Sequence, residues 1–122
     1  MSKILIVEDD PMLSEIYQMK LSSSGFEVFL AETGKQALEI IKKEKIDVVL
    51  SDLVMPEMDG FKLLKILRSG EYDPNIKIIM LSNLSQDDSR KEVLGLGANG
   101  FLAKSDFTPA EMVKEVKRMI NA

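Results

Sequence analysis

The sequence contains no histidine, no cysteine and no tryptophan among its 122 residues. Without histidine there is no imidazole to act as general base, metal ligand or phosphoryl carrier. Without cysteine there is no disulfide framework and no thiol chemistry, which is compatible with a reducing cytoplasm, and we expect a cytoplasmic protein. Any reactive groups must therefore be carboxylates, hydroxyls and lysines.

Long apolar runs and an excess of positive charge are also missing. No hydrophobic stretch approaches the length of a membrane span, and the first apolar run, residues 4–7, is too short for a secretory signal. The formal net charge is −4, which disfavours direct binding to nucleic acid because phosphate contacts need a clustered basic face. We therefore expect neither a membrane nor a nucleic-acid partner.

What the sequence does contain is five short apolar runs that alternate with segments of helical periodicity. Two aspartates precede helical segments: Asp10 is interpreted as a helix cap and Asp59 as a cap or turn residue, rather than as ligands. The alternation, with short connections and no linker or low-complexity tract, predicts a single α/β domain over residues 1–122, without an output domain. Its parallel sheet would have helices on both faces. The strands are expected at residues 4–7, 26–30, 48–50, 76–81 and 101–103.

Polar residues follow four of these apolar runs. Glu8 and Asp9 follow the first run, Asp52 the third, Ser82 the fourth and Lys104 the fifth. The carboxyl ends of parallel strands share one edge, where ligands bind in open α/β sheets. Three close carboxylates repel one another, and Mg²⁺, which takes oxygen ligands, relieves that repulsion. With a hydroxyl and an ammonium group opposite, the residues suggest a Mg²⁺-assisted phosphoryl site around Asp52.

At these positions the sequence resembles the receiver domains of bacterial two-component response regulators, in the CheY-like superfamily. The resemblance covers nearly the whole chain, and its four motifs in this order are specific. They are Glu8–Asp9, Ser51–Gly60 (SDLVMPEMDG), Ser82 and Phe101–Lys104 (FLAK). The resemblance implies a flavodoxin-like, doubly wound sheet of five parallel strands in the order 2-1-3-4-5, with five helices.

The resemblance also implies the roles of the acidic residues. Asp52 would be the phosphoacceptor, and it would take a phosphoryl group from a sensor histidine kinase or a histidine phosphotransfer protein. Asp9 and Asp52 would ligate Mg²⁺ together with the backbone carbonyl of Val54. Glu8 would act through metal-bound water or nearby. The protein would not otherwise be an enzyme: it would only catalyse its own phosphorylation and its own slow dephosphorylation.

The remaining implied roles concern the switch. Lys104 would pair with one phosphoryl oxygen and Ser82 would donate a hydrogen bond to another. The movement of Ser82 would let Phe101 change rotamer, and the surface of the fourth helix, fifth strand and fifth helix would change with it. The downstream protein target is not indicated by the sequence, and the chain is expected to be a monomer or a weak homodimer.

The sequence departs from the family pattern beside two of these residues. Ser105 follows Lys104 where most members have a proline in a cis peptide, and we expect Lys104 to reach the site nevertheless. Asn83 stands where the family often has a small residue. Val54 and Leu84 are apolar where other members have groups that position a hydrolytic water, which suggests slow self-dephosphorylation.

The sequence argues against one alternative function and leaves a second one open. A haloacid-dehalogenase-like phosphatase would need a second aspartate two residues after Asp52, where Val54 stands, and it would need a cap insertion. A receiver fold that acts as a phosphorylation-independent interaction module, with a partner bound through the last helices, stays open at this point.

Overall fold

The sheet is built from five strands whose positions follow the apolar runs. β1 spans Lys3–Val7, β2 Glu27–Ala31, β3 Val48–Asp52, β4 Lys77–Ser82 and β5 Gly100–Ala103. All neighbouring strands are parallel, in the order β2-β1-β3-β4-β5, which confirms the predicted fold class. The computed structural model describes residues 2–55, 58–82 and 87–120.

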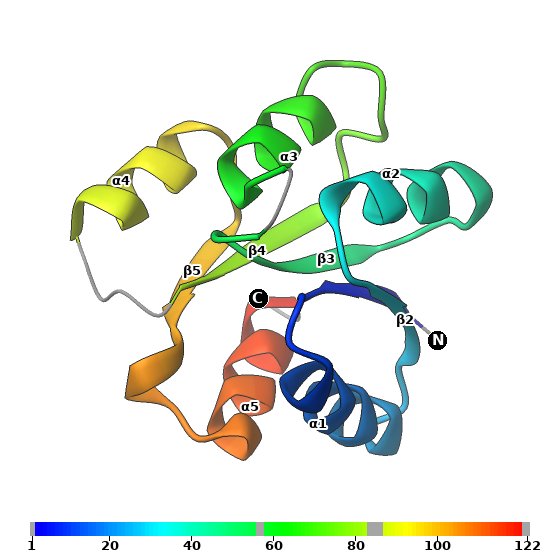
Figure 1. Ribbon diagram of the computed structural model, residues 1–122, viewed down its shortest axis with the longest axis vertical. Coiled ribbons are helices and arrows are strands. Elements are labelled where there is room, and N and C mark those ends of the chain that lie inside the picture. Colours follow the sequence, from blue (N-terminus) through cyan, green and yellow to red (C-terminus); the bar gives the residue numbers. More distant parts are fainter. Residues whose placement is uncertain (1, 56–57, 83–86, 121–122) are drawn as a thin grey trace.

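Five α-helices cover the two faces of the sheet (Figure 1). They are α1 (Pro11–Ser23), α2 (Gly34–Lys43), α3 (Gly60–Leu67), α4 (Asp87–Gly95) and α5 (Pro109–Ile120), and a 3₁₀ turn, η1 (Lys104–Asp106), follows β5. Helices α1 and α5 lie together on one face, and α2, α3 and α4 lie on the other. No helix within the described residues is long and apolar enough to cross a bilayer.

Side chains of the central strands point alternately into two cores, as the period of two requires. Leu5 and Val49 belong to the core beneath α2, α3 and α4, whereas Ile4 and Leu50 belong to the core beneath α1 and α5. All four are essentially inaccessible to solvent. Because both faces are covered, these strands are apolar throughout except at their ends.

Helix caps were predicted correctly at Asp10 and Asp59. An Asp10 carboxylate oxygen accepts hydrogen bonds from the amides of Met12 and Leu13, at 3.0 and 3.4 Å, and Asp59 accepts one from Lys62 N at 2.9 Å. These bonds satisfy amides that have no partner inside the helix. They begin α1 and α3 at the sheet edge that carries the polar strand ends, and so they fix the first turns around that edge.

One arginine links neighbouring segments at the end of the sheet opposite the predicted site. Arg68, just after α3, donates through Nε to the carbonyl oxygen of Gly97 at 2.9 Å and through Nη2 to Asn99 Oδ1 at 2.9 Å. Asn99 in turn bonds through its backbone and side chain to Ile78 of β4. The connection between α4 and β5 is therefore anchored away from the predicted site.

Candidate functional site

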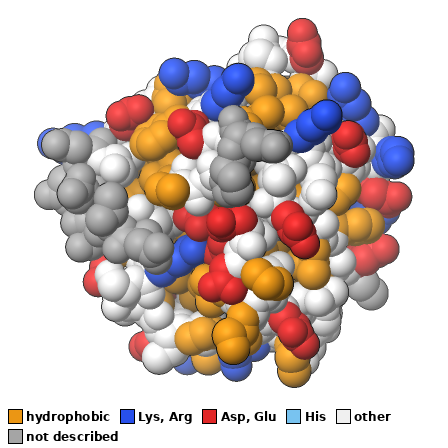
Figure 2. Space-filling view, in the orientation of Figure 1, with side chains coloured by type: hydrophobic (Ala, Val, Ile, Leu, Met, Phe, Trp, Pro, Cys, Tyr) orange, Lys and Arg blue, Asp and Glu red, His pale blue; other side chains and the backbone are white. Residues whose placement is uncertain are grey.

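The predicted acidic residues come together where β1 and β3 end. Asp52 is the last residue of β3, and Glu8 and Asp9 directly follow β1. One carboxylate oxygen from each of the three lies within 4.8 Å of the other two. Glu8 and Asp52 are buried while Asp9 is exposed. Because Asp9 is exposed, the group is open to solvent on one side. Figure 2 shows acidic side chains gathered near the centre of this view.

Lys104 joins the two buried carboxylates. Its Nζ lies 2.5 Å from Glu8 Oε1 and 3.0 Å from Asp52 Oδ2, and its side chain is only 10% exposed. No peptide bond among the described residues is cis, so the bond between Lys104 and Ser105 is trans. Lys104 is the first residue of η1, and from this 3₁₀ turn it reaches Asp52 without the family's proline.

Burial and charge act against each other in this group. Burial raises the pKa of the Glu8 carboxyl, the hydrogen bond from Lys104 lowers it and the Asp52 charge raises it further, to a value of about 7. Burial alone would lower the pKa of Lys104, but its bonds to Glu8 and Asp52 outweigh this and raise the pKa above its usual value. Each buried charge therefore depends on the others, and loss of Lys104 would leave two carboxylates unpaired.

A glycine holds the loop after β3 against the strand. The amide of Gly60 donates to the carbonyl oxygen of Leu53 at 2.8 Å. A Cβ at this position would lie 2.5 Å from the carbonyl oxygen of Asp52 and 2.7 Å from both Leu53 Cα and Met80 Cε. Only a residue without a side chain lets α3 begin this close to the phosphoacceptor candidate.

The other predicted residues are placed less directly. Ser82 ends β4 and is buried, and the sheet register pairs it with Ala103 and pairs Asp52 with Leu81, so these strand ends are level. The side chain of Val54 is 73% exposed. The hypotheses that concern Asn83 and Leu84 lie outside the described residues.

Phe101 lies on β5, in the core beneath α2, α3 and α4. It is 2% exposed, and the guanidinium carbon of Arg90 on α4 lies 5.2 Å from the centre of its ring. The sequence indicated neither this contact nor the close approach at Gly60. No pattern in the sequence singled out Arg90, and Asp59 before a helical segment indicated only a helix start.

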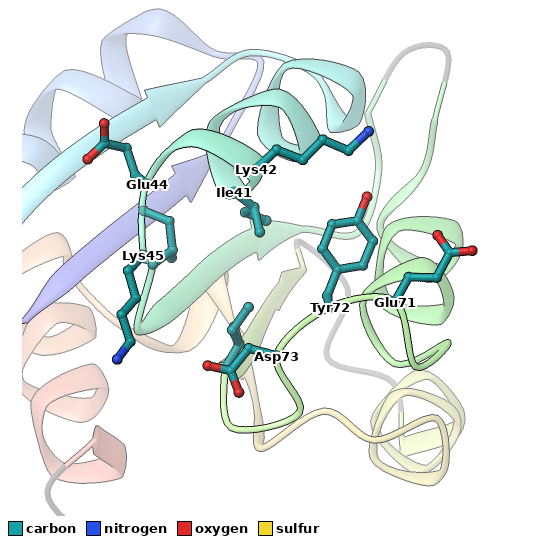
Figure 3. Close-up of a pocket in the computed structure, with 9 residues that line it drawn as sticks. Ile41, Lys42, Glu44, Lys45, Glu71, Tyr72 and Asp73 are labelled. Atoms are coloured by element: carbon teal, nitrogen blue, oxygen red, sulfur yellow. The ribbon is translucent and has the colours of Figure 1, made fainter.

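A separate cavity of about 340 Å³ lies at the opposite edge of the sheet, between the end of α2 and the loop before β4. Its apolar lining includes Ile41, Ile46 and Tyr72. Figure 3 shows Ile41 and Tyr72 facing each other across it, while Glu44 and Lys45 point away. None of the predicted site residues lines this cavity.

The fold agrees with comparisons against known proteins. The chain matches the model of the response regulator receiver domain over residues 4–117, and it therefore belongs to this family of two-component signalling domains. Chemotaxis response regulator CheY4 of Vibrio cholerae superposes with a TM-score of 0.89 at 32% identity, over 98% of each chain.

Two further relatives extend the comparison. The receiver domain of sensor histidine kinase PA1611 from Pseudomonas aeruginosa, determined with a magnesium ion coordinated in its active site cleft, gives a TM-score of 0.84 at 30% identity over 99% of this chain and 98% of that one. Response regulator GtcR of Aneurinibacillus migulanus is 35% identical over 121 residues, which cover 98% of this chain and 48% of GtcR. The chain spans about half the length of the curated relatives it matches.

Proposed function

We propose that Asp52 accepts a phosphoryl group from a phosphohistidine on a sensor histidine kinase or a histidine phosphotransfer protein. The observation that carries the proposal is the Asp52 carboxylate itself, which ends a central strand beside two more carboxylates and is bound by a buried lysine. Membership of the receiver family supports the same role.

The donor set fits Mg²⁺. Glu8, Asp9 and Asp52 offer only oxygen ligands, and their oxygens are close enough to share one ion. The backbone carbonyl of Val54 would be a further ligand. When bound, the ion would neutralise charge on the transferred phosphoryl group. The PA1611 receiver domain, which holds magnesium in its active site cleft, supports this assignment.

In the reaction, a carboxylate oxygen of Asp52 attacks phosphorus while the bond from phosphorus to the donor imidazole nitrogen breaks. The bonding electrons return to the imidazole, and an acyl phosphate remains on Asp52. Lys104 holds Oδ2 of Asp52 at 3.0 Å and so orients the carboxylate for attack through the other oxygen. After transfer, Lys104 pairs with one phosphoryl oxygen and Ser82 donates a hydrogen bond to another.

The phosphorylated state is read through the surface of α4, β5 and α5. Movement of Ser82 toward the phosphoryl group lets Phe101 change rotamer, which biases a two-state equilibrium. Turnover is limited to self-catalysed phosphorylation and slow self-dephosphorylation. Val54 supports the slow step, because its exposed apolar side chain cannot orient an attacking water.

The test is incubation with acetyl phosphate and Mg²⁺, followed by intact mass measurement. The wild type should gain the mass of one phosphoryl group, and D52N should gain none. Chelation of Mg²⁺ should abolish the gain in the wild type. If the wild type stays unmodified by acetyl phosphate that phosphorylates another receiver domain, Asp52 is not a phosphoacceptor and the chain acts as a phosphorylation-independent interaction module.

A further inference from the structure

A groove with a basic rim runs between α1 and α5, away from the carboxylate group. It has a volume of about 610 Å³, and we call it the α1–α5 groove. Both helices contribute apolar and basic side chains to its lining. These are Met19 and Lys20 from α1, and Ala110, Val113, Lys114 and Lys117 from α5.

The charge of the groove is opposite to that of the whole chain, which is −4. Three lysines line it and only one carboxylate, Glu111, does so. Glu111 Oε1 already accepts a hydrogen bond from the amide of Thr108 at 2.9 Å, in the cap of α5. Among the described residues, Lys20, Lys114 and Lys117 form no ion pair with a carboxylate. The groove therefore carries an excess of positive charge, although the pKa of Glu111, lowered mainly by its hydrogen bonds with Thr108, is lowered further by the nearby ammonium group of Lys114.

The outer face of α1 continues the apolar part of the groove. Met12, Ile16 and Met19 lie at positions i, i+4 and i+7 and are 73%, 36% and 62% exposed. Tyr17 and Leu21 occupy the inner face and are buried, so α1 is apolar on both sides. Figure 2 shows hydrophobic side chains gathered over the region of α1 and α5, below the acidic centre. The exposed stripe rises about 10 Å along the helix, roughly two turns.

We propose that the α1–α5 groove binds an amphipathic helix of a partner protein, whose apolar anchors lie among acidic residues. A helix that presents side chains at i, i+3 or i+4 and i+7 matches both the exposed stripe and the hollow between two helices. Carboxylates beside its anchors would meet Lys20, Lys114 and Lys117. An anionic bilayer fits less well, since lipid-binding clusters usually hold about four to eight basic residues and a flat surface does not enter a groove.

The experiment uses two synthetic helical peptides with leucine at the same i, i+4 and i+7 positions, one with glutamate and the other with lysine at the flanking positions. Binding to the full chain is measured by fluorescence anisotropy, and the contact is mapped by amide chemical shifts. The glutamate peptide should bind at least about tenfold more tightly than the lysine peptide at low salt. Its shift changes should concentrate in residues 16–20 and 110–117.

Variants then separate the groove from general electrostatics. K114E/K117E should weaken binding of the glutamate peptide by about tenfold, and M19Q should weaken it without a change in charge. The matched control, K42E/K45E, makes the same charge change beside the other cavity and should leave binding unchanged. Phosphoryl uptake from acetyl phosphate should be normal in K114E/K117E. Failure of the groove proposal can therefore be distinguished from failure of the proposed role of Asp52.

Several results would overturn the proposal. They are equal binding of the two peptides, no binding, shift changes outside the groove, and equal loss in the control variant. Binding of the chain to phosphatidylglycerol vesicles but not to the peptide would assign the groove to lipid instead. Self-association of the wild type that K114E/K117E abolishes would assign it to a second copy of the chain.

Discussion

Substitution of Gly60 by alanine tests how tightly the first turn of α3 must pack against β3. The added methyl would lie 2.5 Å from the carbonyl oxygen of Asp52 and 2.7 Å from Leu53 Cα, whereas nonbonded carbon atoms prefer roughly 3.5–4.0 Å. Both obstacles are backbone atoms that cannot rotate away, so α3 or the end of β3 must move by roughly 1 Å.

Overpacking of this kind costs about 1–3 kcal/mol, and the rigid backbone places G60A near the upper end. Restriction of the unfolded chain by alanine returns about 0.4–1 kcal/mol. We therefore expect G60A to lower the free energy of unfolding by about 2 kcal/mol, measured by urea denaturation with circular dichroism. Because a shift of about 1 Å can slow a positioned reaction by about a hundredfold, the rate of phosphoryl uptake from acetyl phosphate should fall by at least tenfold.

Gly95 provides the matched control, because apart from its chain neighbours and the backbone of its own helix no atom lies within 4 Å of the Cβ that alanine would add there, and its φ is not in the left-handed region. G95A should leave the free energy of unfolding unchanged or raise it by up to about 1 kcal/mol, and it should not affect phosphoryl uptake. If G60A unfolds at the same urea concentration as the wild type and is phosphorylated at the same rate, the argument from close approach is refuted.

Other expected outcomes concern the charges and the aromatic ring. K104A should lower the free energy of unfolding by up to about 3–5 kcal/mol in urea denaturation without divalent ions, since it leaves two buried carboxylates unpaired; an unchanged midpoint would contradict this. Mg²⁺ at about 100 times its dissociation constant should stabilise the wild type by about 2.7 kcal/mol, and D9N should need more Mg²⁺ for the same rise in melting temperature. A double-mutant cycle of R90Q and F101L should give a coupling of about 0.5–1 kcal/mol, and zero coupling would exclude a stabilising ring contact. Phosphorylated protein, followed by intact mass, should persist for minutes or longer at neutral pH; decay within seconds would refute the role given to Val54.

The sequence predicted the features that depend on neighbouring residues or on a general property of parallel sheets. The apolar runs predicted the strands, and aspartates that can cap a helix, Asp10 and Asp59, predicted two helix starts. The rule that parallel strands end at one edge of a sheet predicted that Glu8, Asp9 and Asp52 lie close together. Each of these depends on chain connectivity and the alternation of strand and helix, which are visible in the sequence.

The contacts that the sequence did not predict join residues far apart in the chain. The sequence predicted that Lys104 would reach the site, but it did not predict that the ammonium group would bond to Glu8 as well as to Asp52. Arg90 covers Phe101 because α4 lies across β5, which depends on how one helix packs on the sheet. Such details are settled by tertiary packing, and a sequence pattern carries little information about them.

The ion pairs around Asp52 also bear on how far a signal can travel as an electric field. With all groups ionised, Glu8, Asp9 and Asp52 together with Lys104 carry a net charge of −2, which one divalent cation cancels. Under the proposed function, phosphorylation of Asp52 would then add only about one negative charge at neutral pH. At physiological ionic strength the part of this field that passes through solvent is largely screened beyond roughly 8 Å. If the proposed switch operates, a partner bound at a more distant surface would hardly sense this charge and would instead have to recognise a change in the shape of the protein.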